Sequence, residues 1–182
     1  SAASLKRLEG KVRLLRYQPG QPLSAADLVP SEVLLIQEGQ ARLLVRDQER
    51  LSTLRRLGSG DLVGLASLLR ANGCEDVAAS TPVLALAISD ATILQLLAEE
   101  ASFQQWCAST LWPAELYALL EEQQQRRAGQ SASVSERFRA LLDQAGLVSP
   151  TADAVEEALA GGQAVFVASA NAQSLPLGTP LT

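Results

Sequence analysis

The chain has 182 residues, 47 % apolar and 19 % charged, a composition typical of a globular protein with one sizeable core, or one domain and part of a second. The absence of histidine excludes Ser-His and Cys-His nucleophile pairs and histidine-based metal sites, so we expect no enzyme and no metal centre. The net charge of −5 argues against nucleic-acid binding, and no apolar run approaches the roughly 20 residues that span a bilayer.

The first 90 residues predict short strands separated by turns. Residues 33–45 contain two apolar runs that meet at Glu38-Gly39, where Gly39 can supply the positive φ of a hairpin. Gly58-Ser59-Gly60-Asp61 is a second strong turn signal. The predicted strands are residues 12–17, the two halves of 33–45, 52–57 and 82–88. Short strands at this spacing favour an all-β barrel or jelly roll.

After residue 89 the hydrophobic period changes to that of helices. Asp90 is predicted to cap the first helix, Pro113 to open a later one, and Ser133 to form a capping box with Glu136. The predicted helices are residues 91–100, 103–111, 113–127, 136–146 and 152–160. Residues 163–170 return to strand character, so the chain ends in a helix–helix–strand segment.

The stretch RRAGQSASVS, residues 126–135, is the predicted linker. We therefore predict a β-roll with C-terminal helices over residues 1–125, followed by a linker and a helical and strand extension over 126–182. PGQPL at 19–23 is echoed by LGTPL at 177–181, which raises the hypothesis that a second similar unit begins there. Chance recurrence of glycine and proline is the alternative.

The glycines and apolar runs follow an order that resembles a known family. LLIQEGQARLLV is followed by LGSGDLVG, by LASLL and by a strand that leads into ATILQLLAEEASF. With Gly39, Gly58, Gly60, Asp61 and Gly64 at matching positions, residues 10–112 resemble the cyclic-nucleotide-binding domain. The resemblance implies a mainly β fold with α, a double-stranded β-helix (jelly-roll) barrel flanked by helices.

In that family a phosphate-binding cassette follows the glycine at Gly64. A glutamate there holds the ribose hydroxyl, and an arginine followed by a small residue neutralises the cyclic phosphate farther along. This chain carries Leu65 at the glutamate position, Cys74 at the arginine position and Glu75 at the small-residue position. Loss of the arginine alone costs on the order of a hundredfold in affinity. The resemblance therefore implies a degenerate cassette without cyclic nucleotide as a cofactor.

The cassette residues also have structural interpretations. Leu65 is interpreted as core filling, and Cys74 as a small half-buried residue rather than a redox sensor. Glu75 and Asp76 are interpreted as solvated loop charges. Arg70 is the only cation within the loop and is the candidate substitute for the missing arginine. Backbone N–H groups near Gly64 could attract an anion weakly.

The leading functional hypothesis is a regulatory or sensory domain that acts on an adjacent domain of the same polypeptide. The absence of methionine favours a segment of a longer protein. The two cysteines, too few for a disulfide framework, favour a reduced, cytoplasmic setting. The lysine-poor composition favours a bacterial source, and the resemblance then implies a fusion such as a peptide-exporting ATP-binding cassette transporter. A homodimer through the C-terminal helices is an alternative contact.

The second hypothesis is a transcription regulator of the cyclic AMP receptor type. Residues 133–160 predict helix, turn and helix. The second helix carries Asp153, Glu156 and Glu157 but no lysine or arginine, which does not suit a phosphate-lined groove. We therefore place this hypothesis behind the first.

Overall fold

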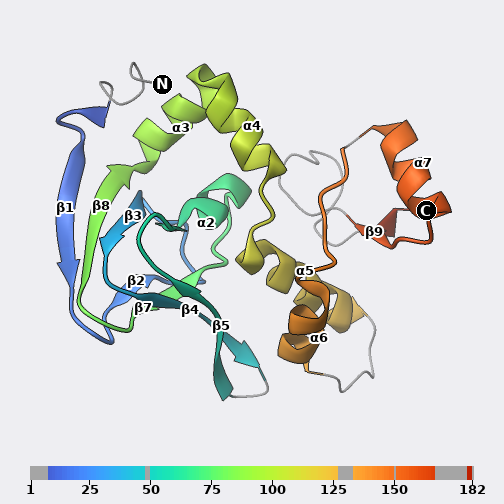
Figure 1. Ribbon diagram of the computed structural model, residues 1–182, viewed down its shortest axis with the longest axis horizontal. Helices are drawn as coiled ribbons and strands as arrows, with labels where there is room; N and C mark the ends of the chain where they lie inside the picture. Colours follow the sequence, from blue (N-terminus) through green and yellow to red (C-terminus); the bar gives the residue numbers. More distant parts are fainter. Residues whose placement is uncertain (1–7, 48–49, 127–132, 150, 167–179, 182) are drawn as a thin grey trace. The chain divides into compact units, whose positions relative to one another are not determined.

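The chain divides into two compact units, residues 1–110 and residues 111–182, in a computed structural model that describes residues 8–47, 50–126, 133–149, 151–166 and 180–181 (Figure 1). The strands are β1 Val12–Tyr17, β2 Pro22–Ser24, β3 Glu32–Glu38, β4 Ala41–Asp47, β5 Arg50–Leu57, β6 Leu62–Val63, β7 Asp76–Ala79, β8 Val83–Ser89, β9 Val165–Phe166 and β10 Pro180–Leu181. The helices are α2 Leu65–Arg70, α3 Asp90–Glu99, α4 Ala101–Ser109, α5 Pro113–Arg126, α6 Val134–Leu141 and α7 Ala152–Ala160.

The first unit is a jelly roll built from two four-stranded antiparallel sheets. One sheet has the order β1-β8-β3-β6 and the other has the order β2-β7-β4-β5. Alternate residues of β7 and β8 are buried, as expected for strands with one face toward a core. The predicted mainly β fold is confirmed. β2, β6 and β7 were not predicted, because they are too short to show a clear alternation of apolar and polar residues.

Two tight turns hold the roll in register. Gly39, between β3 and β4, has φ 90°, and a Cβ built on it would lie 2.1 Å from the carbonyl oxygen of Pro82. Only glycine fits this close approach between the β3–β4 and β7–β8 connections. β3 and β4 lie in different sheets, so the predicted hairpin is a turn that crosses from one sheet to the other. At the next turn the Gly58 N–H donates to Asp61 Oδ2 at 2.8 Å, and Arg55 pairs with Asp61 at 3.5 Å. The predicted turn at residues 58–61 is thus stabilised by the side chain of its own Asp61.

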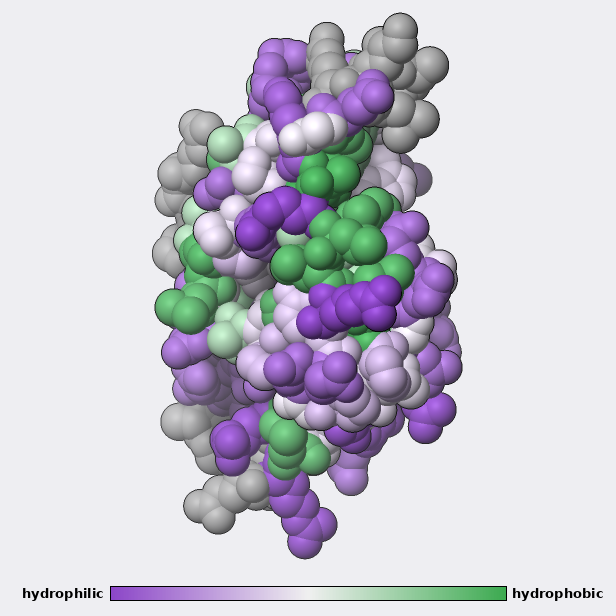
Figure 2. Space-filling view, turned by 90° about the vertical axis from the view of Figure 1, so that its left-hand side faces the viewer, coloured by the Kyte–Doolittle hydropathy of each residue, from purple (hydrophilic) through white to green (hydrophobic). Residues whose placement is uncertain are grey.

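A row of leucines crosses the outer face of the first sheet. Leu14 on β1 is opposite Leu86 on β8, Leu86 is opposite Leu35 on β3, and Leu35 is opposite Leu62 on β6. Leu14 is 57 % exposed, and the other three are half-buried. Figure 2, which views the side of the molecule that carries β1, shows a hydrophobic patch among polar residues. The opposite face of this sheet carries Leu34, Ile36 and other core residues.

Helices α3 and α4 follow β8 directly. Ser89, rather than the predicted Asp90, is the N-cap of α3, and its hydroxyl accepts from the Thr92 N–H. The prediction was wrong by one residue because serine and aspartate both cap well and only the backbone decides between them. Helix α3 contacts both β8 and β3, and its buried residue is Ile93.

The second unit is mainly helical. Tyr117 on α5 packs edge-on against Phe138 on α6, with ring centroids 6.1 Å apart, and Phe138 is fully buried. Ser133 caps α6 as predicted and accepts from the Glu136 N–H. Helix α6 ends at Leu141, so the predicted extension to residue 146 was wrong. β9 and β10 pair antiparallel.

Several predictions concern residues outside the described ranges. Residues 127–132 of the predicted linker, the far half of the strand at 163–170 and most of the echo at 177–181 fall there. The ends of the predicted linker at 126–135 were wrong, because Arg126 belongs to α5 and residues 134–135 belong to α6. The domain boundary after residue 125, at the end of α5, stays a prediction. Among the described residues, none of the helices is long and apolar enough to cross a bilayer, and no group of histidine, cysteine or acidic side chains could hold a metal ion.

Candidate functional site

The candidate site is the segment from Gly64 to Asp76, which joins β6 to β7 through α2. Gly64 is the N-cap of α2 with φ 89°, a left-handed conformation that favours glycine. A Cβ at this position would also lie 3.0 Å from Cγ of Pro30. The first residues of α2, Leu65 to Leu68, are all buried. The glycine thus lets the chain turn sharply from a strand into a helix that faces the core.

Ser67 connects the two arms of this segment. Its Oγ accepts from the backbone N–H groups of Cys74, at 3.1 Å, and Glu75, at 3.2 Å, and lies 3.5 Å from Cys74 Sγ. Ser67 is only 1 % exposed. Ser67 was not among the predicted site residues, because a serine inside a short apolar helix gives no local sign of a partner seven residues away.

Glu75 turns inward and its carboxylate meets the start of α2. The side chain is 6 % exposed, and Oε2 accepts from the Ser67 N–H at 2.9 Å. Its backbone carbonyl accepts from Ser24 Oγ at 2.7 Å, which ties β7 to β2. The interpretation of Glu75 as a solvated loop charge was therefore wrong. A helix start offers unpaired N–H groups, and the carboxylate meets that demand.

Burial raises the pKa of Glu75 above its ordinary value. The backbone amides of Ser67, Gly64 and Ala66 lower it in part, because they bind the ionised form. Burial also raises the pKa of Asp76, which is half-buried rather than solvated. The site therefore holds a carboxylate whose charge is stabilised by backbone dipoles and opposed by desolvation.

A pH-dependent stability follows from Glu75. Its folded-state pKa lies above the unfolded value, so the folded state binds the proton more tightly, and stability from this group is lost as pH rises through the folded pKa. Glu75→Gln removes this titration and keeps an acceptor oxygen. We expect the free energy of unfolding of the Gln variant, minus that of the wild type, to increase between pH 4.5 and pH 7.5. Urea denaturation at both pH values measures it, and a difference that is constant or larger at low pH contradicts the expectation.

The other predicted site residues lie around the same segment. Leu65 is fully buried, as core filling requires, and Cys74 is half-buried. Burial is the largest influence on the Cys74 thiol and raises its pKa, while Ser67 and Arg70 act to lower it. Arg70 ends α2, and its Nη1 is buried without a hydrogen-bond partner among the described residues. The structure thus brings Gly64, Leu65, Arg70, Cys74 and Glu75 together in one loop.

Comparison with known proteins gives a family match within the first unit. The family model described as "Cyclic nucleotide-binding domain" matches residues 14–100. Residues 14–100 belong to the cyclic-nucleotide-binding-like family. Domains of this family regulate rather than catalyse. No curated protein matches the chain.

Solved structures share the fold of this cyclic-nucleotide-binding-like domain. A regulatory subunit of a cAMP-independent protein kinase A from Trypanosoma brucei is 18 % identical, with a TM-score of 0.53 over 59 % of this chain and 40 % of its own. The Trypanosoma cruzi counterpart bound to guanosine is 15 % identical, with a TM-score of 0.52 over 79 % and 44 %. A cyclic nucleotide-binding domain from Methylobacillus flagellatus is 19 % identical, with a TM-score of 0.50 over 57 % and 59 %. The matched part of each is thus less than two thirds of that structure's own chain.

Proposed function

We propose that this domain is a regulatory module that does not bind cyclic nucleotide in the usual way and that acts on an adjacent domain of the same polypeptide. The observation that carries the proposal is the inward-facing Glu75. Its carboxylate bonds to the amides at the start of α2, in the cassette where the family resemblance puts the cyclic phosphate. An acid of the same chain thus meets the backbone donors that a bound phosphate would use.

Two further positions support the proposal. Leu65 is fully buried and offers no acceptor for a ribose hydroxyl. Cys74, at the arginine position, has a thiol that cannot carry a positive charge, and burial raises its pKa and favours the neutral form. A phosphate that entered here would meet a carboxylate without a bidentate guanidinium, a repulsive arrangement in a half-buried site. Arg70 is the one cation that the described loop offers.

The two Trypanosoma structures are examples of this fold in proteins described as independent of cyclic AMP. Both are described as regulatory subunits of a cAMP-independent kinase, and one of them holds guanosine. The output of the present chain is proposed to be mechanical, through movement of the helices that follow β8. We further propose a cytoplasmic, non-catalytic role, with a bacterial peptide-exporting transporter as the adjacent machinery. A homodimer through the C-terminal helices is the alternative contact.

Isothermal titration calorimetry of the purified chain with cyclic AMP and cyclic GMP tests the proposal. We expect no saturable binding of either nucleotide in the submillimolar range, because Glu75 already bonds to the amides. Submillimolar affinity for either nucleotide would overturn the proposal. In that event Arg70→Gln shows whether Arg70 replaces the family arginine, and Arg16→Gln, an exposed arginine on β1, is the matched control. Salt-sensitive retention on DNA would instead favour the transcription-regulator alternative.

A further inference from the structure

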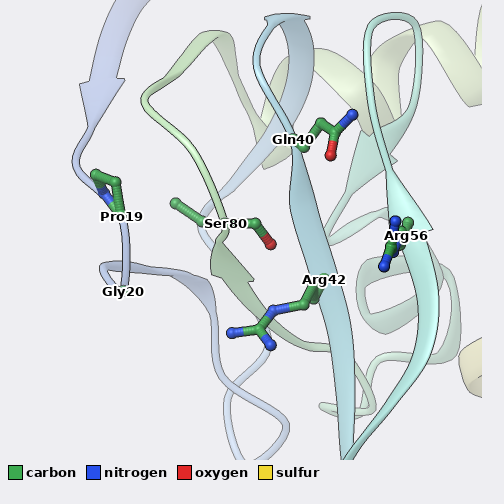
Figure 3. Close-up of a pocket in the computed structure, with 7 residues that line it drawn as sticks. Pro19, Gly20, Gln40, Arg42, Arg56 and Ser80 are labelled. Atoms are coloured by element: carbon green, nitrogen blue, oxygen red, sulfur yellow. The ribbon is translucent and has the colours of Figure 1, made fainter.

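A polar pocket lies outside the cassette. It has a volume of about 470 Å³ and is lined by Pro19, Gly20, Gln40, Arg42, Arg56, Ala79 and Ser80. These residues come from β4, β5, the end of β7 and the turns beside them. Figure 3 shows Arg42 reaching from β4 toward the turn with Gly20, and Arg56 on the neighbouring strand. None of the lining residues belongs to the segment from Gly64 to Asp76.

The two arginines of this pocket are direct cross-strand neighbours. Arg42 on β4 is in register with Arg56 on β5, and Arg42 faces Ala78 of β7 on its other side. Like charges at opposed positions of a sheet repel each other and destabilise the pair. Neither arginine forms an ion pair within the part of the chain that the structure describes, and the pocket lining contains no carboxylate. In a chain with a net charge of −5, this is an uncompensated concentration of positive charge.

Neutral hydrogen-bonding groups complete the lining. Ser80 Oγ is buried and has no hydrogen-bond partner among the described residues. Its backbone N–H donates to the carbonyl of Gln40 at 2.8 Å, so the two residues are held side by side. A buried hydroxyl without a partner costs free energy unless a ligand or a water satisfies it. The pocket lining therefore combines two guanidinium groups with a buried hydroxyl that can donate or accept a hydrogen bond.

We propose that this pocket binds a small organic phosphate monoester. A phosphate monoester carries nearly two negative charges at neutral pH, which matches two guanidinium groups. Its oxygens accept the paired N–H donors of arginine in bidentate fashion and can also accept from a serine hydroxyl. The volume falls within the roughly 300 to 1,000 Å³ of ligand pockets and exceeds the needs of a bare phosphate. Binding would relieve the repulsion between Arg42 and Arg56, so the ligand would also stabilise the β4–β5 pair.

Calorimetric titration at low ionic strength tests the proposal with ribose 5-phosphate and inorganic phosphate as probes. We expect ribose 5-phosphate to bind with one-to-one stoichiometry and submillimolar affinity. Arg42→Gln and Arg56→Gln should each weaken it about tenfold or more, since each removes a charge-assisted contact. The exposed Arg16 on β1 provides the matched control, and Arg16→Gln should change the affinity less than twofold. Circular dichroism verifies that each variant is folded.

The opposite outcomes are distinct. Failure of ribose 5-phosphate to bind overturns the proposal, and so does an equal loss in Arg16→Gln, which would reveal diffuse surface attraction. Equal affinity for inorganic phosphate overturns the assignment to an organic monoester. Thermal unfolding gives a second readout: without ligand, Arg42→Gln should raise the midpoint at low salt. Ribose 5-phosphate should raise the midpoint of the wild type and of Arg16→Gln, and raise that of Arg42→Gln much less. If cyclic AMP binds the wild type and binds the Arg42 and Arg56 variants equally well, the proposed function is refuted, because the nucleotide then binds outside this pocket. That result would not contradict the proposal for the pocket.

Discussion

Replacement of Leu65 by glutamate, the residue of the family pattern at this position, is expected to lower the free energy of unfolding by about 4 kcal/mol. Leu65 is 0 % exposed and is the first residue of α2. The new carboxylate would be buried without a cation, beside amides that already hold Glu75. Urea denaturation at pH 7 measures the loss.

A matched control separates charge from shape at the same position. Leu65→Met keeps the volume and the apolar character, and it is expected to cost less than about 1.5 kcal/mol. If Leu65→Glu is as stable as Leu65→Met, the cavity accepts a carboxylate, and Leu65 is not evidence of a closed cassette. If instead Leu65→Glu is much less stable than Leu65→Met, glutamate at position 65 requires a compensating cation.

Glu75→Ala is expected to lower the free energy of unfolding by about 3 kcal/mol. The change removes a buried acceptor and leaves the amides at the start of α2 without their partner. It also leaves a cavity between α2 and the start of β7. Thermal and urea unfolding at pH 7 measure the effect. Asp76→Ala, at the half-buried neighbour, is the control and is expected to cost less than about 1 kcal/mol.

A second measurement distinguishes a stabilising carboxylate from an occupied cassette. If Glu75 blocks the amides, Glu75→Ala should bind inorganic phosphate or cyclic AMP better than the wild type does, although weakly without an arginine. A variant that loses stability and gains no anion affinity would mean that Glu75 holds the loop without competing for a ligand. Unchanged stability would contradict the buried hydrogen bonds altogether.

Hydrogen bonds between its own residues hold the loop from Gly64 to Asp76 in shape. Ser67 bonds to the backbone at Cys74 and Glu75, and Glu75 bonds back to the Ser67 amide. The loop thus closes on itself through reciprocal hydrogen bonds. In the proposed function, the cassette loop is stabilised by its own side chains, and the domain would be regulated by binding at a different site. The pocket that contains Arg42 and Arg56 is one candidate for such a site.

Local features of the fold could be predicted because they depend on residues close in sequence. The turn with positive φ at Gly39, the turn ending at Asp61 and the N-cap at Ser133 follow from backbone conformation and short-range hydrogen bonds. The hairpin pairing predicted at Gly39 was wrong, because β3 and β4 pair with strands of different sheets. The order of glycines and strands in the sequence was sufficient to predict the jelly-roll fold. The short strand β7 escaped prediction because its pattern is set by pairing with β2 and β4, far along the chain.

The candidate site divides in the same way. From the sequence alone, the positions of Gly64, Leu65, Cys74 and Glu75 could be assigned, together with the absence of the glutamate and arginine of the family pattern. The direction of the Glu75 side chain could not be predicted from the sequence. Whether a carboxylate faces water or the N–H groups at the start of a helix depends on the packing around it. The register that opposes Arg42 to Arg56 also escaped, since it depends on a bulge at Leu43/Leu44. The sequence alone determined which side chains the loop and the sheet carry. The tertiary structure decided which of these side chains are buried, which are paired and which line an open pocket. Burial and pairing of this kind arise only between segments that are distant in the chain.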